Sequence, residues 1–229
     1  SDNLLQKQIT GNLQKDIALL QTLFTNDDTL RIRRICNTAN PALNCALLFF
    51  DGMINMQVVN EFIVKPISQS PYRADKDHIE ELLKTKIIQT EQVETTAEIQ
   101  KISQAMLYGD SILFVDGLKN AFIISSKGWE KRSVMEPPSE QVFRGPREGF
   151  TEAIMTNTSL LRRKVQNPDL KFKFLNLGTE THTKVCISYI ENLAKPELID
   201  EVEDRLRAIQ LDSILDSNYI QEMIKDAPH

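Results

Sequence analysis

The chain has 229 residues, of which 41% are hydrophobic and 26% are charged, as is typical of a folded protein. Its mean hydropathy is -0.29 and its longest apolar run spans residues 46–50, whereas a membrane-spanning helix needs about 20 apolar residues. The first residues lack the pattern of a secretory signal, and the net charge of -5 argues against general nucleic-acid binding. We therefore expect a soluble, non-secreted polypeptide with a sizeable core.

The N-terminal part predicts a helix followed by two strands. Apolar residues at helical spacing over 4–24 indicate a helix, which the polar stretch 26–28 ends. Alternation over 30–36 and the apolar run over 44–50 predict two strands. A further helix should follow until Pro66 stops it, because proline has no N–H to donate.

Composition predicts a loop over 68–75, and periodicity predicts helices over 76–88 and 95–108. A buried strand over 111–115 and a strand over 121–125 then lie at hairpin distance. Two of the buried strands end in Asp-Gly turns, at Asp51-Gly52 and Asp116-Gly117. The similarity of these two stretches leaves an internal repeat open, although strand-then-Asp-Gly is also common turn chemistry.

The C-terminal part predicts a helix over 146–165, an antiparallel strand pair over 171–177 and 183–190, and helices over 196–207 and 217–224. Gly145 and Pro146 suit the start of the first of these helices. Its apolar side chains should be buried, namely Phe150, Ile154, Leu161 and Val165.

Together these elements predict a mixed α/β fold with two small lobes. We expect an N-terminal α/β lobe over 1–127 and a C-terminal α/β lobe over 150–229. Residues 128–149 are rich in proline, glycine and arginine, and they should form the connector.

The sequence contains no motif that supports catalysis. It has neither a phosphate-binding nor a dinucleotide-binding glycine loop, and no nucleophile elbow. Its cysteines are odd in number and lack metal-like spacing, so we expect small core residues at Cys36, Cys45 and Cys186. We predict no cofactor, no metal site and no enzyme activity.

Charge is distributed unevenly along the second half. Residues 127–173 hold ten Lys or Arg and six acids, a net of +4, whereas residues 174–229 hold five and eleven, a net of -6. This pattern suggests complementarity within the chain or between subunits. Arg144 and Arg147 flank the predicted helix start, where they can either hold an anion or pair with nearby glutamates such as Glu148.

At these residues the chain resembles a known family. The stretches GDSILFVDG at 109–117, IISSKGWEKRSVMEPPSEQVFRGPREGFTEAIMTNTSLLRRKVQNPDLK at 123–171 and SYIENLAKPELIDEV at 188–202 are similar to the A subunit of GerA-type spore germinant receptors. The second half resembles the family closely. The first half does so more loosely, through FFDGMIN at 49–55 and the VKPI that ends the following helix.

The resemblance implies an N-terminal domain cut just before a membrane-spanning region that follows residue 229. The family's receptors combine A, B and C subunits in the spore inner membrane and respond to nutrients such as amino acids, sugars or nucleosides. A subunits are thought to form an ion-conducting pore, and the pattern holds no catalytic residue. The absent signal peptide and the free cysteines favour the cytoplasmic, spore-core side for this domain.

Our leading hypothesis is a signalling and assembly domain that couples nutrient sensing to ion release, with B, C and other A subunits as partners. The alternative is a module that binds the nutrient directly between two lobes. Candidate interface or ligand-contact residues are Trp129, Arg132, Glu136, Arg144, Arg147, Glu148, Asn157, Arg162 and Arg163, and candidate structural-motif residues are Asp51, Gly52, Asp116, Gly117, Gly145 and Pro146.

Overall fold

The computed structural model describes residues 2–40, 43–71, 78–88, 93–125, 150–178 and 182–208, which belong to two compact units. The sheet unit comprises Ser1–Thr25, Thr29–Val134 and Leu161–Pro168, and the hairpin unit comprises Asn26–Asp28, Met135–Leu160 and Asp169–His229. The two units therefore interleave along the sequence. The predicted lobe boundaries at residues 128 and 149 lie outside the described residues and stay predictions.

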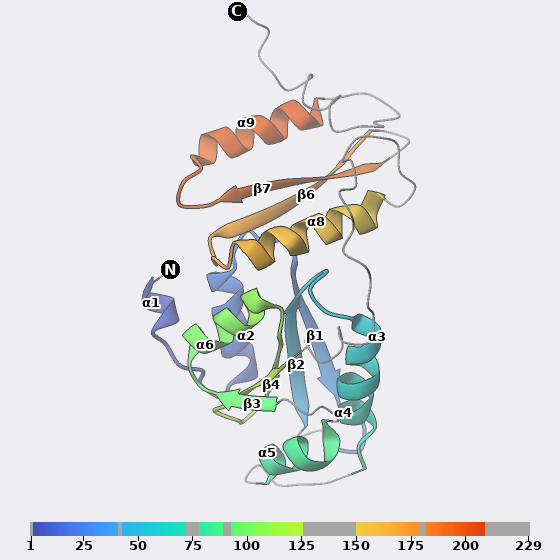
Figure 1. The fold of residues 1–229 in the computed structure, drawn as a ribbon. Coiled ribbons are helices and arrows are strands. Elements are labelled where there is room, and N and C mark those ends of the chain that lie inside the picture. The colour runs from blue at the N-terminus through green and yellow to red at the C-terminus, as the bar shows by residue number, and fades with distance from the viewer. Residues whose placement is uncertain are drawn as a thin grey trace, which may run out of the picture. The chain divides into compact units, whose positions relative to one another are not determined.

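The sheet unit is built on a five-stranded antiparallel sheet (Figure 1). The strands are β1 (Leu30–Cys36), β2 (Asn44–Phe50), β3 (Val93–Thr96), β4 (Ser111–Val115) and β5 (Ala121–Ile124), in the order β1-β2-β4-β5-β3. The predicted hairpin of β4 and β5 is confirmed, as is the mixed α/β class. Because β2 and β4 lie in the interior of the sheet, both are apolar runs without polar interruption.

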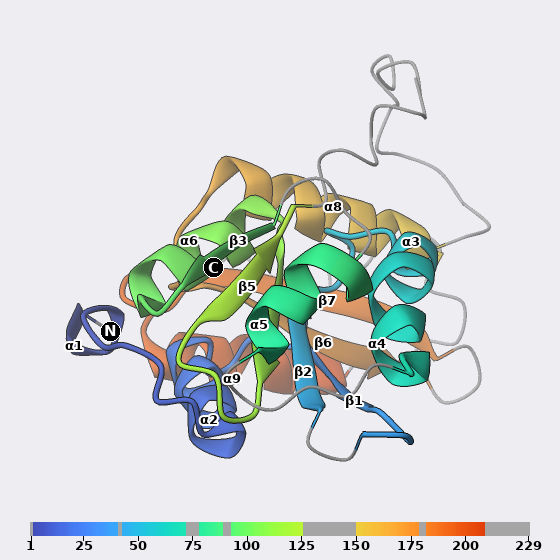
Figure 2. The ribbon, with the colours of Figure 1, turned by 90° about the horizontal axis from the view of Figure 1, so that it is seen from below.

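Helices cover both faces of this sheet (Figures 1 and 2). One face packs against α1 (Asp2–Leu5), α2 (Leu13–Leu23) and α6 (Ile99–Tyr108), and the other against α3 (Met56–Val59), α4 (Lys65–Gln69) and α5 (Ile79–Leu82). Successive strand residues serve opposite layers: Leu47 packs in the cluster that contains Val59, and Leu48 in the cluster that contains Leu20 and Ile102. The sheet unit is thus a three-layer sandwich.

The single helix predicted over 4–24 is wrong, because the chain leaves the helix after α1 and begins a new one at Leu13. Gly11 between them has a φ of 84°, a left-handed conformation that an α-helix cannot contain. Asn12 then caps α2, since its Oδ1 accepts the backbone N–H of Lys15 at 3.0 Å.

Pro66 does not end its helix, contrary to the prediction. The chain passes from α3 through a π-helical turn, Asn60–Val64, into α4, which continues to Gln69. In this turn the N–H of Lys65 donates to the carbonyl of Asn60, five residues back. A π turn already leaves one carbonyl without its usual donor, so the missing N–H of proline costs no further bond.

The helix predicted over 95–108 begins too early. Residues up to Thr96 form β3, in which Thr95 pairs with Phe122 of β5, and α6 starts only at Ile99. Threonine is β-branched and favours the extended conformation, and pairing with β5 determines the outcome.

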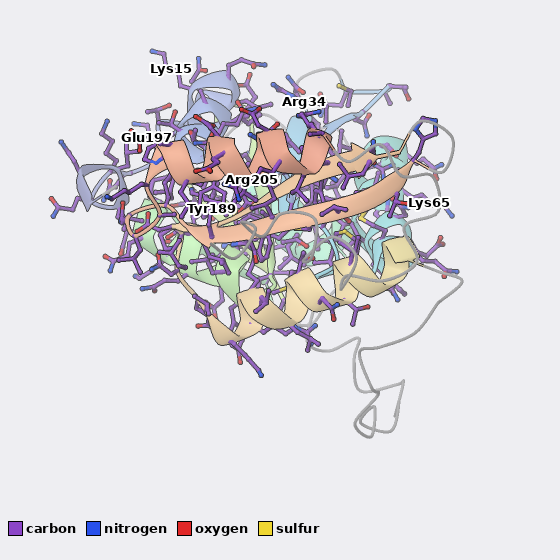
Figure 3. The ribbon with its side chains drawn as sticks, turned by 90° about the horizontal axis from the view of Figure 1, so that it is seen from above. Lys15, Arg34, Lys65, Tyr189, Glu197 and Arg205 are labelled. Carbon is purple, nitrogen blue, oxygen red and sulfur yellow. The ribbon has the colours of Figure 1, made fainter. Side chains whose placement is uncertain are left out.

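The hairpin unit contains the predicted strand pair, β6 (Leu170–Leu177) and β7 (Thr183–Ile190), and the predicted helix α9 (Pro196–Arg207). Figure 3 shows Tyr189 on β7 and both Glu197 and Arg205 on α9. Among the described residues of this unit, a hydrophobic cluster forms around Leu175, Leu177 and Leu206. The helix predicted over 217–224 lies outside the described residues.

Candidate functional site

Most of the predicted contact residues precede helix α8 (Phe150–Lys164), in a part of the chain outside the described residues. These are Trp129, Arg132, Glu136, Arg144, Arg147 and Glu148, and the structural-motif candidates Gly145 and Pro146 also lie outside the described residues. Of the three candidates on α8, Asn157 and Arg163 are exposed, whereas Arg162 is 1% exposed. Arg162 is therefore buried, whereas its basic neighbours Arg163 and Lys164 are exposed.

The burial of α8 differs from the expected pattern. Leu161 and Val165, predicted to be buried, are 41% and 37% exposed, and Ile154 is partly buried. Among the side chains of α8 that the structure describes, the buried ones are Thr158, Ser159 and Arg162. The helix itself satisfies the first two, because the Thr158 hydroxyl donates to the Met155 carbonyl at 3.0 Å and Ser159 bonds in the same way. The spacing of the apolar residues therefore predicted the wrong buried face for the described side chains of this helix.

Arg162 lies against an aromatic pair in the sheet unit. Its guanidinium carbon is 3.9 Å from the centroid of the Phe50 ring, and its Nη2 donates to the hydroxyl of Thr29 at 3.2 Å. The ring of Phe24 meets that of Phe50 edge to face, with centroids 5.0 Å apart. Three segments distant in sequence thus meet at Phe50.

This arrangement stabilises a charge that would otherwise be costly to bury. The guanidinium stays protonated at any ordinary pH, so Arg162 carries its full charge in the core. A desolvated cation over an aromatic ring gains about 2 kcal/mol, and a hydrogen bond to a charged group about 1.5–3 kcal/mol. Because these gains require correct geometry, removing either Phe50 or Thr29 would remove one of the contacts that stabilise the buried charge.

Residues 24–29, which we call the crossing segment, leave the sheet unit and return to it. Phe24 and Thr29 belong to the sheet unit and are 2% and 1% exposed, whereas Asn26–Asp28 belongs to the hairpin unit. Asn26 has a φ of 62°, which asparagine tolerates better than most residues. The polar stretch that ends α2 therefore also directs the chain into the second unit.

Within the hairpin unit, the crossing segment is held along β6. The N–H of Asp28 donates to the carbonyl of Phe172 at 2.8 Å, and the Asp28 carboxylate accepts the N–H of Phe174 at 2.8 Å. The amide of Asn26 donates to the carboxylate of Glu191 at 2.9 Å. These bonds occupy part of the outer edge of β6.

Glu191 also pairs with a buried lysine. The Lys171 ammonium lies 3.5 Å from the Glu191 carboxylate, and the Lys171 side chain is only 2% exposed. A buried ammonium needs such a counter-charge because its desolvation is costly. The contact that holds Asn26 is therefore part of a charge pair that the unit needs for its own stability.

The structure places both Asp-Gly steps in turns of the sheet unit, with Gly52 at a φ of 77° and Gly117 at 88°. Asp51 pairs with Arg31 at 2.9 Å, and its N–H donates to the carbonyl of Thr29 at 2.8 Å. The first turn therefore lies directly beside the residue that contacts Arg162.

The second Asp-Gly turn holds the start of α2. The Asp116 carboxylate accepts the N–H of Leu13 at 3.2 Å, and the Gly117 N–H donates to the carbonyl of Gly11 at 2.7 Å. Asp16, which the sequence did not single out, completes this junction. It is 2% exposed and accepts the N–H groups of Thr10 and Gly11 at 2.8 and 2.9 Å.

The cysteines were expected to be core residues, and for Cys36 this is wrong: it is exposed near the end of the edge strand β1. Cys45 is buried and Cys186 partly buried. Burial raises the pKa of both the Cys45 and the Cys186 thiol to about 12.

The described residues contain no group of three or more His, Cys, Asp or Glu suited to a metal ion. Among the described helices, none is long and apolar enough to cross a membrane.

Comparison with known proteins identifies the family. Residues 18–229 match the family described as Bacillus/Clostridium GerA spore germination protein. Spore germination protein KA of Bacillus subtilis (strain 168) is 31% identical over 218 residues, which cover 95% of this chain and 40% of that protein. The uncharacterized membrane protein YfkQ of the same strain is 33% identical, over 96% of this chain and 42% of that protein. The chain thus spans about two-fifths of the length of these relatives.

The fold is also found in a solved structure, the N-terminal domain of the A subunit of the Bacillus megaterium spore germinant receptor GerK3. The TM-score is 0.72 at 24% identity, and the match covers 97% of this chain and 83% of that chain. The structural match extends over both the sheet unit and the hairpin unit. Since the family match itself extends from residue 18 to residue 229, the chain belongs to the GerA family of spore germination proteins.

Proposed function

We propose that this chain is the signalling and assembly domain of the A subunit of a nutrient germinant receptor, and that it helps to trigger spore germination. The observation that carries the proposal is the family match over residues 18–229, which includes parts of both units. Relatives that cover the same region include spore germination protein KA and spore germination protein GerLA. In this role the domain couples nutrient sensing to ion release through a membrane region elsewhere in the receptor.

The chemistry of the buried polar residues supports a structural relay rather than catalysis. Asp16, Arg162 and Lys171 are each buried. Arg162 and Lys171 each contact a residue from another segment of the chain, and Asp16 binds the loop directly before its own helix. Perturbed acids and bases at an active site are usually arranged around a substrate cleft. Here the buried charges join segments instead, so the domain acts by holding and transmitting geometry.

The partners in this proposal are the receptor's B and C subunits and other A subunits. The receptor resides in the spore inner membrane, with this domain on the cytoplasmic, spore-core side. The uneven charge of the second half favours contacts between subunits, because its basic part, 127–173, can meet the acidic part, 174–229, of a neighbour. With a net charge of -5, nucleic acid is not among the expected partners.

A germination assay tests the assigned role. Spores carrying Arg147→Ala in the full receptor should release ions more slowly after addition of nutrient, or accumulate less receptor on an immunoblot. The control is Lys15→Ala, which removes an exposed cation on α2 (Figure 3). Wild-type release and receptor level in the Arg147→Ala spores would contradict the role of the connector.

A binding experiment tests whether the domain senses the nutrient itself. For a signalling and assembly domain, calorimetric titration of the chain with amino acids, sugars and nucleosides should give no heat of binding. Saturable binding at physiological nutrient concentrations would replace the proposal with a direct nutrient-binding function.

A further inference from the structure

Strand β1 forms one edge of the five-stranded sheet, and no strand of the described residues pairs with its outer side (Figure 2). It pairs with β2 in unbroken register, from Leu30 opposite Phe50 to Cys36 opposite Asn44. Natural edge strands are usually short, bulged or covered, because an open edge can pair with another chain. The opposite edge strand, β3, has only four residues, whereas β1 has seven. The sheet unit can therefore accept a further strand beside β1.

The hydrogen bonds at the two ends of β1 show which of its backbone groups face outward. The N–H of Asp51 donates to the carbonyl of Thr29 at 2.8 Å, and the N–H of Asn37 donates to the carbonyl of Leu43 at 3.3 Å. Bonded and non-bonded pairs alternate along an antiparallel ladder, so the odd-numbered residues of β1 direct their backbone groups toward β2. The outward backbone groups belong to the even-numbered residues, which include Ile32, Arg34 and Cys36.

Three arginines line this edge, and β1 itself contains no acid. One of them forms the ion pair with Asp51 described above. Arg34 instead donates to the side-chain amide oxygen of Gln14 on α2, at 2.7 Å. Arg33 donates to the side-chain amide oxygen of Asn60, which lies after α3 on the other face of the sheet. Because amide oxygens are neutral, these two contacts position a guanidinium on each face of the edge without cancelling its charge.

This charge determines which kind of strand can be added. A second copy that paired through its own β1 would place arginines beside arginines, and like charges facing each other destabilise a sheet. Opposite charges stabilise a cross-strand pair, so a strand with acidic residues is favoured. Arg33 and Arg34 are consecutive and lie on opposite faces, so a matching strand carries two consecutive acids.

We propose that the outer edge of β1 docks an extended acidic segment of a partner protein, which joins the sheet as a sixth strand. Backbone hydrogen bonds to Ile32 and Arg34 supply affinity, and the charges of Arg33 and Arg34 select two consecutive carboxylates. This inference rests on the assembly role proposed above, for which it names a surface and the chemistry of its partner. All the contacts that carry it lie within the sheet unit.

Hydrogen exchange of the 229-residue chain in the presence of an acidic peptide tests the proposal. The probe is the peptide TVTEEVTV with blocked ends, and the matched control is TVTQQVTV, which lacks only the charge. With about 1 mM acidic peptide, exchange of the Ile32 and Arg34 amides should slow by about twofold or more, the protection that a Kd of about 1 mM gives. The amides of Arg31 and Arg33 already bond to β2 and serve as internal controls.

A substitution measures the contribution of the charge. Arg34→Gln keeps a donor for Gln14 but removes the charge, so an NMR titration should show the acidic peptide binding about threefold to fivefold more weakly. Lys65→Gln removes an exposed cation on α4 (Figure 3) and should leave binding unchanged.

Three results would overturn the docking edge, and the wild-type chain alone provides them. Unchanged exchange of the Ile32 and Arg34 amides would show that no strand is added. Equal protection by TVTQQVTV would show that the edge does not select acids. Shifted arginine side-chain signals without slower amide exchange would show charge attraction in place of strand pairing.

A parallel germination assay separates the two proposals. Charge-dependent protection of Ile32 and Arg34, together with normal germination of Arg34→Gln spores, would keep the docking edge and reject its part in receptor assembly. Unchanged exchange would reject the docking edge and leave the assembly role to the Arg147→Ala test.

Discussion

Asp16 provides the sharpest test of how the sheet unit is held together. Its carboxylate accepts three hydrogen bonds, from the N–H and hydroxyl of Thr10 and from the N–H of Gly11. Replacing it with alanine removes all three while shortening a side chain that is 2% exposed. We therefore expect Asp16→Ala to destabilise the unit at the junction that Asp116 and Gly117 share with α2.

The magnitude follows from the donors that lose their acceptor. Each hydrogen bond to a charged group is worth about 1.5–3 kcal/mol, but Thr10 is exposed and can turn to water, so the lower end applies to it. The two backbone donors together give a loss of about 3–4.5 kcal/mol in the free energy of unfolding. For a chain of this length that corresponds to a fall of roughly 6–18 °C in Tm. Asp16→Asn keeps one acceptor oxygen and should lose about half as much.

Urea unfolding followed by circular dichroism measures this loss as a lower midpoint at unchanged slope. Lys15→Ala is the matched control, because Lys15 is exposed in the same turn of α2 (Figure 3). A loss below about 0.5 kcal/mol for Asp16→Ala, the range of ordinary surface substitutions, would refute the assignment of these three bonds as the main support of the junction.

Three further predictions concern single positions. Gly11→Ala should destabilise the sheet unit by about 1–3 kcal/mol, because Gly11 has a φ of 84° and an added Cβ would lie 3.2 Å from the Leu118 carbonyl oxygen. Thermal unfolding measures the loss of stability, and an unchanged Tm would contradict the prediction. Hydrogen bonds from Lys173 on β6 and Arg207 on α9 lower the pKa of the Glu203 carboxyl. Its contribution to the stability of the hairpin unit is therefore present at neutral pH and is lost as the pH falls below about 4.5. The stability of Glu203→Gln, followed by NMR, should depend less on acid pH than that of the wild type. With a thiol-reactive maleimide at pH 7.5, exposed Cys36 should react well before buried Cys45, whose pKa is raised to about 12. Equal reaction rates of the two thiols would contradict this prediction.

The sequence correctly predicted the elements in which the pattern of apolar residues agrees with the burial of the side chains. The apolar runs of β2 and β4, the pair of β6 and β7, and α9 all lie where periodicity placed them. β2 and β4 are buried along nearly their whole length, so an unbroken apolar run and tertiary packing agree there.

Prediction failed where a backbone or tertiary effect outweighed periodicity. Gly11 interrupts an apolar spacing that continues across it, and the π turn before Pro66 admits a proline that normally ends a helix. At β3, pairing with β5 overrides the helical spacing that extends back to residue 95. None of these effects is visible in the spacing of apolar residues alone.

The candidate site was harder to predict because its members are charged and distant in sequence. Arg162 lies in a run of three basic residues, and nothing in that run distinguishes it from Arg163. The useful signal was polar: Thr158, Ser159 and Arg162 share one helix face, on which short hydroxyl side chains accompany a single long cation. Reading that stripe as a buried face would have placed Arg162 in the core.

Each of these buried charges joins segments that are remote in sequence. Arg162 contacts Thr29 and Phe50, while Lys171 contacts Glu191, to which Asn26 also binds. An apolar contact in the same place would tolerate sliding, whereas a buried charge is stable only with its partner in position, so it admits few alternative arrangements. Arg162 therefore restricts the arrangement of segments within the sheet unit, and Lys171 does so within the hairpin unit.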